Sequence, residues 1–384
     1  MRKGLGLSLI AIIAAALALS GSAGASSLCD LVASPNGSDT ASGTPAAPFR
    51  TTQKLVDSLA SGQTGCLRGG TYYEDVRIGN GGSPGAPVTL TSYPGEIATL
   101  TGRLWIAQGA NYVTLTRMRL DGANAEQLPS PTVDGNAITF SDDDVTNDHT
   151  SICFDLGSDG YGIANGTLIT RDRIHDCGKL PADNHEHGIY VDVANNTRIE
   201  WNLIYDNADR GIQLYPDAQD TTIDHNVIDG NGEGLLFSGD GGFASSNANV
   251  YANLITNSRI RHDAESWYPQ GNPVGTENLL RGNCIWGGRE GTIDTSGGGF
   301  APRANVIANP LYVDPARHDY RLRSTSPCLA LTGDIAAEVD GPTATAASTH
   351  SSHRRPRGRS AVASRNGSRK AHRARRPRRP HGSR

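Results

Sequence analysis

Two short patterns of apolar and polar residues recur together in the middle of this chain. In the first, a glycine precedes two apolar residues that are separated by one other residue. Its copies begin 23 residues apart, at Gly188, Gly211 and Gly234. In the second, an asparagine lies between apolar residues, and its copies are Asn202, Asn226, Asn253 and Asn283. A period in this range indicates stacked supersecondary units. Each unit holds two or three short strands and no helical periodicity, so we predict an all-β, parallel β-helix.

Strand alternation sorts the side chains of the glycine pattern into two faces. The apolar members should point into the coil: Ile189, Val191, Ile212, Leu214, Leu235 and Phe237. The others should point outwards: Tyr190, Asp192, Gln213, Tyr215, Leu236 and Ser238. Residues at equal offsets from the glycine should stack on successive rungs, about 4.8 Å apart. We interpret the asparagines as structural, because amides at equal turn positions stack in ladders.

The composition along the chain predicts four segments. Residues 1–25 read as an export signal, with Arg2 and Lys3 before an apolar run and small residues at its end. Residues 26–62 form an N-terminal cap that includes a short amphipathic helix, Thr52–Ala60. Residues 63–331 form the coil, with weak register and expected loops near 123–166. Residues 332–384 form a linker and a disordered basic tail.

The apolar run of the signal is too short to cross a bilayer, and no later run is long enough. We therefore expect an exported monomer without a membrane span. Residues 342–384 hold 13 of the 35 basic residues and none of the 39 acidic residues. The body is consequently acidic and the tail strongly basic. The tail should bind an anionic envelope polymer or an acidic glycan rather than nucleic acid, or it serves only to solubilise the chain.

Six cysteines follow the predicted signal, and an even number in an exported protein favours disulfides. We predict the pairs Cys29–Cys66 at the cap, Cys153–Cys177 across adjacent rungs and Cys284–Cys328 at the C-terminal end. Sequence alone leaves the pairing open, and buried free thiols are the alternative. No cysteine or histidine spacing indicates zinc.

Several segments carry a family resemblance. They are the turn-rich start Ser34–Asp39 with Gly43–Thr51, the stretch Leu67–Tyr72, and Tyr93–Glu96. The chain from about residue 31 to 331 resembles bacterial pectate-lyase-like proteins. The resemblance implies a right-handed coil and a secreted or cell-surface location. It is much less informative about activity, because this superfamily contains lyases, hydrolases, epimerases and proteins with no known reaction.

One outward face gathers polar and aromatic side chains. His187, Arg210 and Glu233 precede the three glycines, and Tyr190, Gln213 and Asp192 lie beside them. His185 enters from the preceding loop. This set predicts a sugar-binding groove with acid/base groups. The alternative is a solvated face whose residues form ordinary cross-strand pairs. Further candidate sugar contacts are Tyr215, Glu233 and Trp267, the last on an expected loop, where packing over a rung is equally plausible.

A polysaccharide lyase needs a base and a cation that stabilises the developing charge. The resemblance implies a lysine or arginine base with Ca²⁺ held by acidic residues. The predicted body has only Lys54 and Lys179, which leaves Arg210, His187 or Tyr190 as the base, with Asp192 as a further catalytic candidate. Asp192, Asp217 and Asp240 are candidate Ca²⁺ ligands.

A glycoside hydrolase needs two carboxyls at a defined separation, and Asp217 and Asp240 are one rung apart. His187-Gly188-Ile189 matches part of a polygalacturonase signature, but the aspartate pair expected one rung earlier is absent. We therefore predict a protein that binds an acidic extracellular polysaccharide and cleaves it by elimination. Hydrolysis is the less favoured chemistry, and a non-catalytic carbohydrate-binding or surface protein is the other class that stays open.

Overall fold

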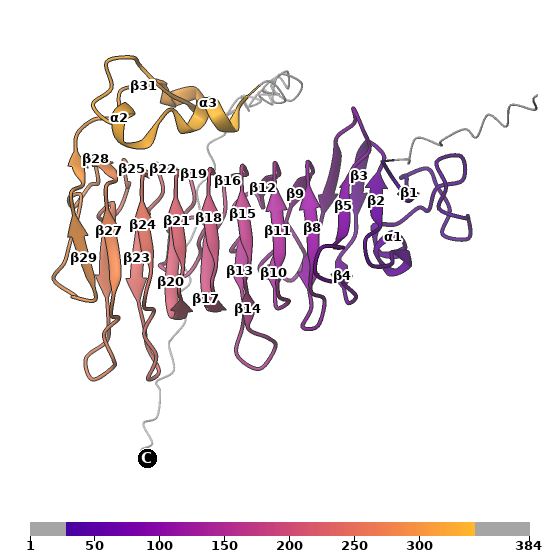
Figure 1. Ribbon diagram of the computed structural model, residues 1–384, viewed down its shortest axis with the longest axis horizontal. Coiled ribbons are helices and arrows are strands. Elements are labelled where there is room, and N and C mark those ends of the chain that lie inside the picture. Colours follow the sequence, from indigo (N-terminus) through magenta and orange to yellow (C-terminus); the bar gives the residue numbers. More distant parts are fainter. Residues whose placement is uncertain (1–27, 342–384) are drawn as a thin grey trace, which may run out of the picture. The chain divides into compact units, whose positions relative to one another are not determined.

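The structure is a computed structural model that describes residues 28–341. The predicted export signal and the basic tail lie outside these residues. Within 28–341, no helix is both long and apolar enough to cross a membrane. The chain winds through three parallel sheets, and each full rung contributes one strand to sheet 1, then to sheet 2, then to sheet 3 (Figure 1).

Every strand of the coil is short. Sheet 1 holds, in spatial order, β1 (Leu31–Ala33), β2 (Thr64–Leu67), β5 (Val88–Ser92), β8 (Val113–Thr116), β11 (Ile138–Ser141), β15 (Leu168–Thr170), β18 (Arg198–Glu200), β21 (Thr222–Asp224), β24 (Asn249–Tyr251), β27 (Asn278–Arg281) and β29 (Phe300–Arg303). Sheet 2 holds β3 (Gly70–Tyr73), β6 (Ala98–Thr101), β9 (Arg119–Asp121), β12 (Asp144–Thr146), β16 (Arg173–His175), β19 (Leu203–Tyr205), β22 (Val227–Asp229), β25 (Leu254–Thr256), β28 (Cys284–Trp286) and β30 (Val306–Ile307). Sheet 3 holds β4 (Val76–Ile78), β7 (Leu104–Ile106), β10 (Thr132–Val133), β13 (Phe154–Leu156), β17 (Ile189–Asn195), β20 (Arg210–Gln219), β23 (Glu233–Ser238) and β26 (Ala264–Trp267), with β14 (Ala164–Asn165) also paired to β17.

The predicted interior of the coil is confirmed. All six apolar residues of the glycine pattern are fully buried, and they stack in register from β17 through β20 to β23. In the region 123–166, strands β10 to β13 continue the coil, and the expected loops are found between strands at 147–153 and 157–163. Phe140 and Phe154, whose ring centres are 4.9 Å apart, fill its interior. The coil is therefore continuous through the segment where the sequence pattern is weakest.

The asparagine column forms a buried ladder in the turn between sheets 1 and 2. Asn226 accepts the backbone N–H of Asn202 through Oδ1 at 2.9 Å. Its Nδ2 donates to the carbonyl of Ile199 and to Oδ1 of Asn253. Each asparagine thus satisfies turn groups that water cannot reach, which confirms the structural interpretation. The ladder continues to Asn283 and ends at Asn305.

Two aspartates extend the same ladder towards the N-terminus. Asp172 accepts the backbone N–H of Asp143, and Asp143 accepts that of Met118. The second carboxyl oxygen of each is buried without a partner. Burial raises the pKa of both carboxyls well above the ordinary 3.8. The charge of Asp142 adds to the shift of Asp143, and the charge of Asp143 adds to the shift of Asp172. Both positions therefore favour the protonated form.

We predict that Asp143→Asn and Asp172→Asn stabilise the protein at pH 8 and change little at pH 4.5. A carboxyl whose pKa is raised by folding contributes stability at low pH, and that stability is lost as pH rises through the raised pKa. An asparagine places an N–H donor where the aspartate has its unpartnered oxygen, and this donor is present at any pH. The gain should be of the size of the cost of an unsatisfied buried polar group, about 1–3 kcal/mol. Thermal unfolding at the two pH values checks this.

Asn226→Asp is the matched control, because it introduces an acid at an amide position of the same ladder. It should lower the melting temperature, and more at pH 8 than at pH 4.5. Stability changes of equal size at both pH values, in either direction, would contradict the protonated ladder.

The coil is covered at its N-terminal end and along one side. Helix α1 (Thr52–Ser58) begins at the predicted residue, buries Leu55 and Val56, and packs near β1, β2 and β4. After the last rung, a C-terminal cover (residues 309–341) continues past the predicted linker boundary at 332. It contains the hairpin β31 (Tyr312–Asp314) and β32 (Asp319–Leu322), the 3-10 turn η1 (Pro315–Arg317) and the helices α2 (Leu329–Thr332) and α3 (Ile335–Val339).

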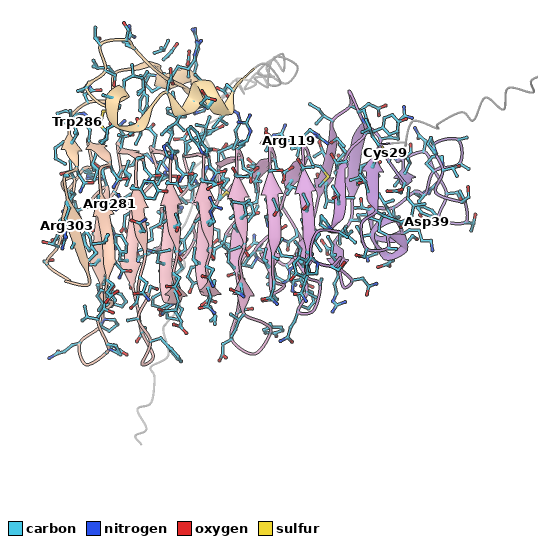
Figure 2. All side chains as sticks on the ribbon, viewed as in Figure 1. Cys29, Asp39, Arg119, Arg281, Trp286 and Arg303 are labelled. Atoms are coloured by element: carbon cyan, nitrogen blue, oxygen red, sulfur yellow. A yellow bond between two sulfur atoms is a disulfide. The ribbon has the colours of Figure 1, made fainter. Side chains whose placement is uncertain are left out.

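The C-terminal cover packs on the outer face of sheet 2. Tyr312, Tyr320 and Ile335 lie in one apolar cluster with Leu203 and Val227 of the coil. Figure 1 shows α2, α3 and β31 lying across the ends labelled β19, β22, β25 and β28. Figure 2 shows that side chains project outwards along the whole coil, among them Arg281 and Arg303, which are paired across β27 and β29. Sheet 2 is thus partly closed to ligands.

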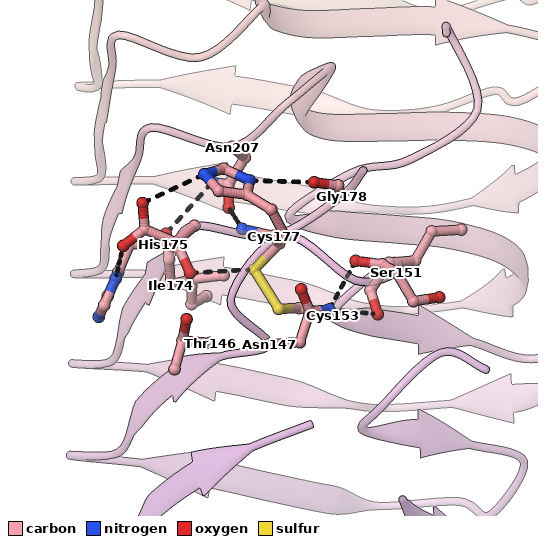
Figure 3. The surroundings of a disulfide bond; sticks show 12 residues. Thr146, Asn147, Ser151, Cys153, Ile174, His175, Cys177, Gly178 and Asn207 are labelled. Carbon is pink, nitrogen blue, oxygen red and sulfur yellow. Dashed lines mark hydrogen bonds and ion pairs between the residues drawn. A yellow bond between two sulfur atoms is a disulfide. The ribbon is translucent and has the colours of Figure 1, made fainter. Parts of the chain in front are cut away.

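All three predicted disulfides are present, with Cα atoms 5.6–5.7 Å apart, and no described cysteine is free. Cys153–Cys177 joins adjacent rungs beside Asn147 and Ser151 (Figure 3). The backbone N–H of Cys153 also donates to the carbonyl of His187 at 3.1 Å. This disulfide therefore fixes the chain immediately before β17, where the predicted site begins.

Candidate functional site

One column of outward side chains runs along the outer face of sheet 3. Strand pairing places its consecutive members opposite each other: Arg77, Trp105, Thr132, Asp155, Tyr190, Gln213, Leu236 and Glu265. Only the part from Tyr190 to Leu236 is predicted from the glycine pattern. The strands that carry Trp105 and Asp155 lack the leading glycine. Their apolar-x-apolar triplets, Leu104–Ile106 and Phe154–Leu156, are the signal that would have found them.

The residues before the glycines form a buried ion pair rather than an exposed column. Arg210 Nε donates to Glu233 Oε2 at 2.9 Å, and both side chains are almost fully buried. The other guanidinium nitrogens donate to the carbonyl and Oδ1 of Asn184. Asn184 belongs to the 179–186 loop, which covers this part of the face and explains why the expected exposure is wrong. Arg210 therefore positions the loop and is fully occupied in doing so.

His187 is a further buried ionisable group next to the pair of Arg210 and Glu233. His187 is 3% exposed and its Nδ1 has no hydrogen-bond partner. Burial and the charge of Arg210 lower the pKa of His187 well below its ordinary value, so the ring stays neutral. Burial raises the pKa of Glu233 to about 7, although Arg210 opposes the shift. A small pocket of about 10 Å³ lies beside the ion pair, and its lining includes Asn184, Arg210, Glu233 and Arg261.

The accessible acid/base groups lie further along the strands. Asp192 is half-buried on the outer side of β17, and burial followed by the charges of Asp159, Asp134 and Asp217 raises its pKa to about 7. Asp155, opposite Tyr190, has its pKa raised further by burial and by the charge of Asp192. One oxygen of Asp155 has no hydrogen-bond partner. Burial thus favours the protonated form of Asp155, while Asp192 is poised to exchange a proton near neutral pH.

Tyr190 lies between these groups on the same face. Its ring is 5.6 Å from that of His187 and stacks on that of Tyr215 at 6.2 Å. Burial and the charge of Asp192 raise the pKa of Tyr190 above its ordinary value, so its phenol stays protonated. This excludes Tyr190 as a base and makes it a hydrogen-bond donor.

A bulge changes the predicted register beyond this point. Val191 pairs with Leu214 but Val193 pairs with Asp217, so β20 contains one extra residue. The predicted equal-offset column of Asp192 and Tyr215 is therefore broken. Bulges of this kind redirect side chains and are common beside active sites. Tyr215 instead donates to Asp240 at 3.4 Å.

The three predicted Ca²⁺ ligands do not converge. Asp240 contacts Tyr215, Asp217 accepts from Gln219, and Asp192 faces Asp159 and Asp134. Among residues 28–341, no group of three or more histidine, cysteine or acidic side chains is arranged to hold a metal ion. The residues present therefore do not fit the expected three-aspartate site, and we derive no step through it.

The remaining candidates lie at the margins of the face. His185 is 80% exposed on the 179–186 loop, within ion-pair distance of Asp183. Trp267 is half-exposed, as expected of a sugar contact, but it ends strand β26 instead of lying on a loop. Gln213 is buried with its Oε1 unpartnered. These residues remain candidate contacts rather than parts of a common centre.

The arrangement of three parallel sheets with its outward column agrees with comparisons with known proteins. A family model described as right handed beta helix region matches residues 108–300, about half of the chain. The chain belongs to this family. The right-handed winding implied by the sequence resemblance is thereby confirmed.

Two curated relatives of this right-handed β-helix protein match over short stretches. One is the uncharacterized protein YwoF of Bacillus subtilis (strain 168), 39% identical over 72 residues, or 19% of this chain and 15% of that protein. The other is pectate lyase PEL9 of Emericella nidulans, 41% identical over 75 residues, or 19% of this chain and 18% of that protein. The matches thus span less than a fifth of either relative.

Solved structures match over more of the chain. Pectate lyase Pel9A aligns with a TM-score of 0.55 and 13% identity, covering 77% of this chain and 90% of its own. XylC in complex with xylose aligns with the same TM-score and identity, covering 72% of this chain and 69% of its own. At this identity, the similarity shows a shared fold.

We predict that Arg210→Ala destabilises the β-helix strongly, and most above pH 7. Removing one partner of a buried ion pair costs about 3–5 kcal/mol, because the other charge stays buried. Arg210 lowers the pKa of Glu233, so in the variant this pKa should rise above its present value of about 7. A neutral Glu233 is tolerated at pH 5, and the loss of stability relative to the parent protein should grow as pH rises towards 8. Urea unfolding at pH 5 and pH 8 measures the difference.

The double variant Arg210→Ala/Glu233→Leu is the control. Without the buried carboxyl, the loss at pH 8 should be smaller than in Arg210→Ala alone. A loss in Arg210→Ala that is independent of pH, or additive effects in the double variant, would contradict the buried pair as its cause.

Proposed function

We propose that this β-helix protein binds an acidic extracellular polysaccharide along the outer face of sheet 3 and cleaves it by elimination. The observation that carries the proposal is the set Asp192, Asp155 and Tyr190 on adjacent strands β17 and β13. One carboxyl is poised near neutral pH, and the two other groups are held protonated. The short match to a pectate lyase and the shared fold with Pel9A support a carbohydrate substrate.

In this mechanism, Asp192 takes the proton from the carbon next to the carboxyl of a uronate residue. Protonated Asp155 and Tyr190 donate hydrogen bonds to that carboxyl as negative charge develops on it. The neighbouring carbon–oxygen bond of the glycosidic link then breaks, a carbon–carbon double bond forms, and the leaving oxygen takes a proton. A base with a pKa near the working pH is the most effective. A carboxylic acid kept neutral can stabilise such an intermediate by donating a hydrogen bond.

Hydrolysis is the second candidate, because two carboxyls whose pKa values are pushed apart also suit a general acid and its partner. The two reactions give Asp155 different roles. In elimination it only donates a hydrogen bond, whereas in hydrolysis it must release its proton. A non-catalytic binding protein would use neither carboxyl for proton transfer.

We predict that Asp192→Asn lowers the rate of formation of unsaturated product from polygalacturonate or alginate by about 10²–10⁴-fold. Asp155→Asn, which keeps a hydrogen-bond donor, should retain much of the activity that Asp155→Val loses. The rate should rise with pH through about 7, as Asp192 loses its proton, and fall where Asp155 ionises. Ultraviolet absorbance of the unsaturated product measures the rate.

Reducing-end formation without unsaturated product would establish hydrolysis, and Asp155→Asn should then be as inactive as Asp155→Val. Binding without either product would leave the non-catalytic class. Each of these interpretations requires that the Asp192 and Asp155 variants are folded at the assay temperature, which thermal unfolding checks.

We further propose that the basic tail attaches the protein to an anionic polymer. Its 13 basic residues are unaccompanied by acidic ones, and exposed charges are screened over about 8 Å at physiological ionic strength. Deleting residues 342–384 should abolish salt-dependent retention on a polyanion column and leave the melting temperature unchanged. Retention equal to that of the full chain would contradict this role.

A further inference from the structure

Two arginines and a tryptophan lie together at the N-terminal end of the sheet 3 column. The guanidinium of Arg77 is 5.0 Å from the ring centre of Trp105, and that of Arg103 is 5.3 Å from it. Tyr161, which is 63% exposed, meets the edge of the same ring at 6.5 Å. None of the side chains of this Trp105 cluster belongs to the ion pair of Arg210 or to the set Asp192, Asp155 and Tyr190.

The two guanidinium groups are not neutralised by the protein. Across residues 28–341, neither group has an ion pair or a side-chain hydrogen bond, and Nε of Arg103 is buried without a partner. By contrast, Arg68 forms an ion pair with Glu96, and Arg171 forms one with Asp142. The charge of Arg103 acts on the pKa of Asp155 without a direct contact. A buried N–H donor and two guanidinium groups without an ion pair at one place favour an anionic ligand.

The cluster is held rigidly by a buried acid that takes no part in ligand binding. Asp134 is 1% exposed and accepts the indole N–H of Trp105 at 2.7 Å through one oxygen. Its other oxygen accepts the hydroxyl of Ser158 at 3.0 Å. Ser158 begins the tight turn that carries Tyr161, which closes by a hydrogen bond to Gly162. Asp134 thereby fixes both aromatic residues, and rigid aromatic surfaces suit sugar rings.

The position of the cluster relates it to the proposed site. Trp105 is separated from Tyr190 by three strand steps, through Thr132 and Asp155, which is a distance of about 14 Å at the usual interstrand spacing. A polysaccharide that lies along the coil would therefore contact both. The acidic residues near Asp192 cannot themselves attract an anionic chain, so charge complementarity must come from elsewhere on this face.

We infer that Arg77 and Arg103, arranged around Trp105, form a remote subsite that binds the carboxylate of a uronate residue while Tyr161 packs on its ring. This subsite deepens the proposed function, on which it rests for the polysaccharide substrate, and it identifies the substrate as one with negative charge several residues from the cleaved bond. Its role is binding and register, not proton transfer.

The test measures binding in the full chain carrying Asp192→Asn, so that no substrate is consumed. The probes are oligogalacturonates and the neutral oligosaccharides made from them by carboxyl reduction, and calorimetry gives the affinity. Arg77→Gln and Arg103→Gln should each weaken oligogalacturonate binding by at least about tenfold. Arg103→Lys, which keeps the charge, should lose less. Affinity for the reduced oligosaccharides should stay unchanged.

Arg317→Gln is the matched control, because this arginine is 85% exposed on the C-terminal cover and pairs only with Asp314. The basic tail is present in every variant, so its contribution is common to all of them. Oligogalacturonate affinity that is unchanged in both glutamine variants, or an equal loss for the neutral oligosaccharides, would overturn the subsite. Charge-dependent binding without unsaturated product from the parent protein would instead count against the proposed elimination alone.

Discussion

Each turn of this coil must satisfy backbone groups that the next rung hides from water. Backbone pairing between rungs does this within the sheets, but not at the corner between sheets 1 and 2. There, the amide ladder that includes Asn202, Asn226 and Asn253 supplies both a donor and an acceptor at every step. An asparagine side chain presents its acceptor oxygen and its donor nitrogen on separate atoms. The ladder therefore repeats at the spacing of the backbone pairing, at which the interior aliphatic residues also pack.

The regular spacing of the rungs aligns side chains on the outer face of sheet 3. Side chains from distant parts of the sequence, such as Trp105 and Glu265, are placed on one line by strand pairing alone. Where the line is interrupted, the interruption is local. The bulge in β20 redirects Tyr215 towards Asp240, and the 179–186 loop buries Arg210. The acid group of Asp192 lies between these two irregularities. A uniform scaffold thus carries a local departure where ionisable groups are brought together.

The fold follows from sequence because burial and turn chemistry repeat. Apolar residues such as Ile212 and Leu214 follow a glycine at the same sequence spacing in each rung. This spacing predicts which residues of the adjacent rungs stack on them. The disulfide pairing could also be predicted from the sequence, because the coil brings the predicted cysteine pairs close together. The site is less predictable. Nothing near Arg210 indicates that Asn184 folds over it, and the extra residue in β20 leaves no mark in the apolar pattern. Asp155 lies in a rung without the glycine, so its pairing with Tyr190 is visible only once the register is known.

The C-terminal cover has a consequence for the order in which the molecule matures. The ion pair of Arg173 with Asp340 joins residues 167 positions apart, and Cys284–Cys328 joins the last rungs to the cover. Rungs can be added one after another as the chain emerges, because each contacts mainly its predecessor. The outward Leu203 and Val227 of sheet 2, however, become buried only when residues of the C-terminal cover, which are synthesised much later, pack on them. The coil thus passes through a stage in which all its rungs are formed but an apolar surface on sheet 2 is still exposed to solvent. Only the last part of the chain to be synthesised buries this surface.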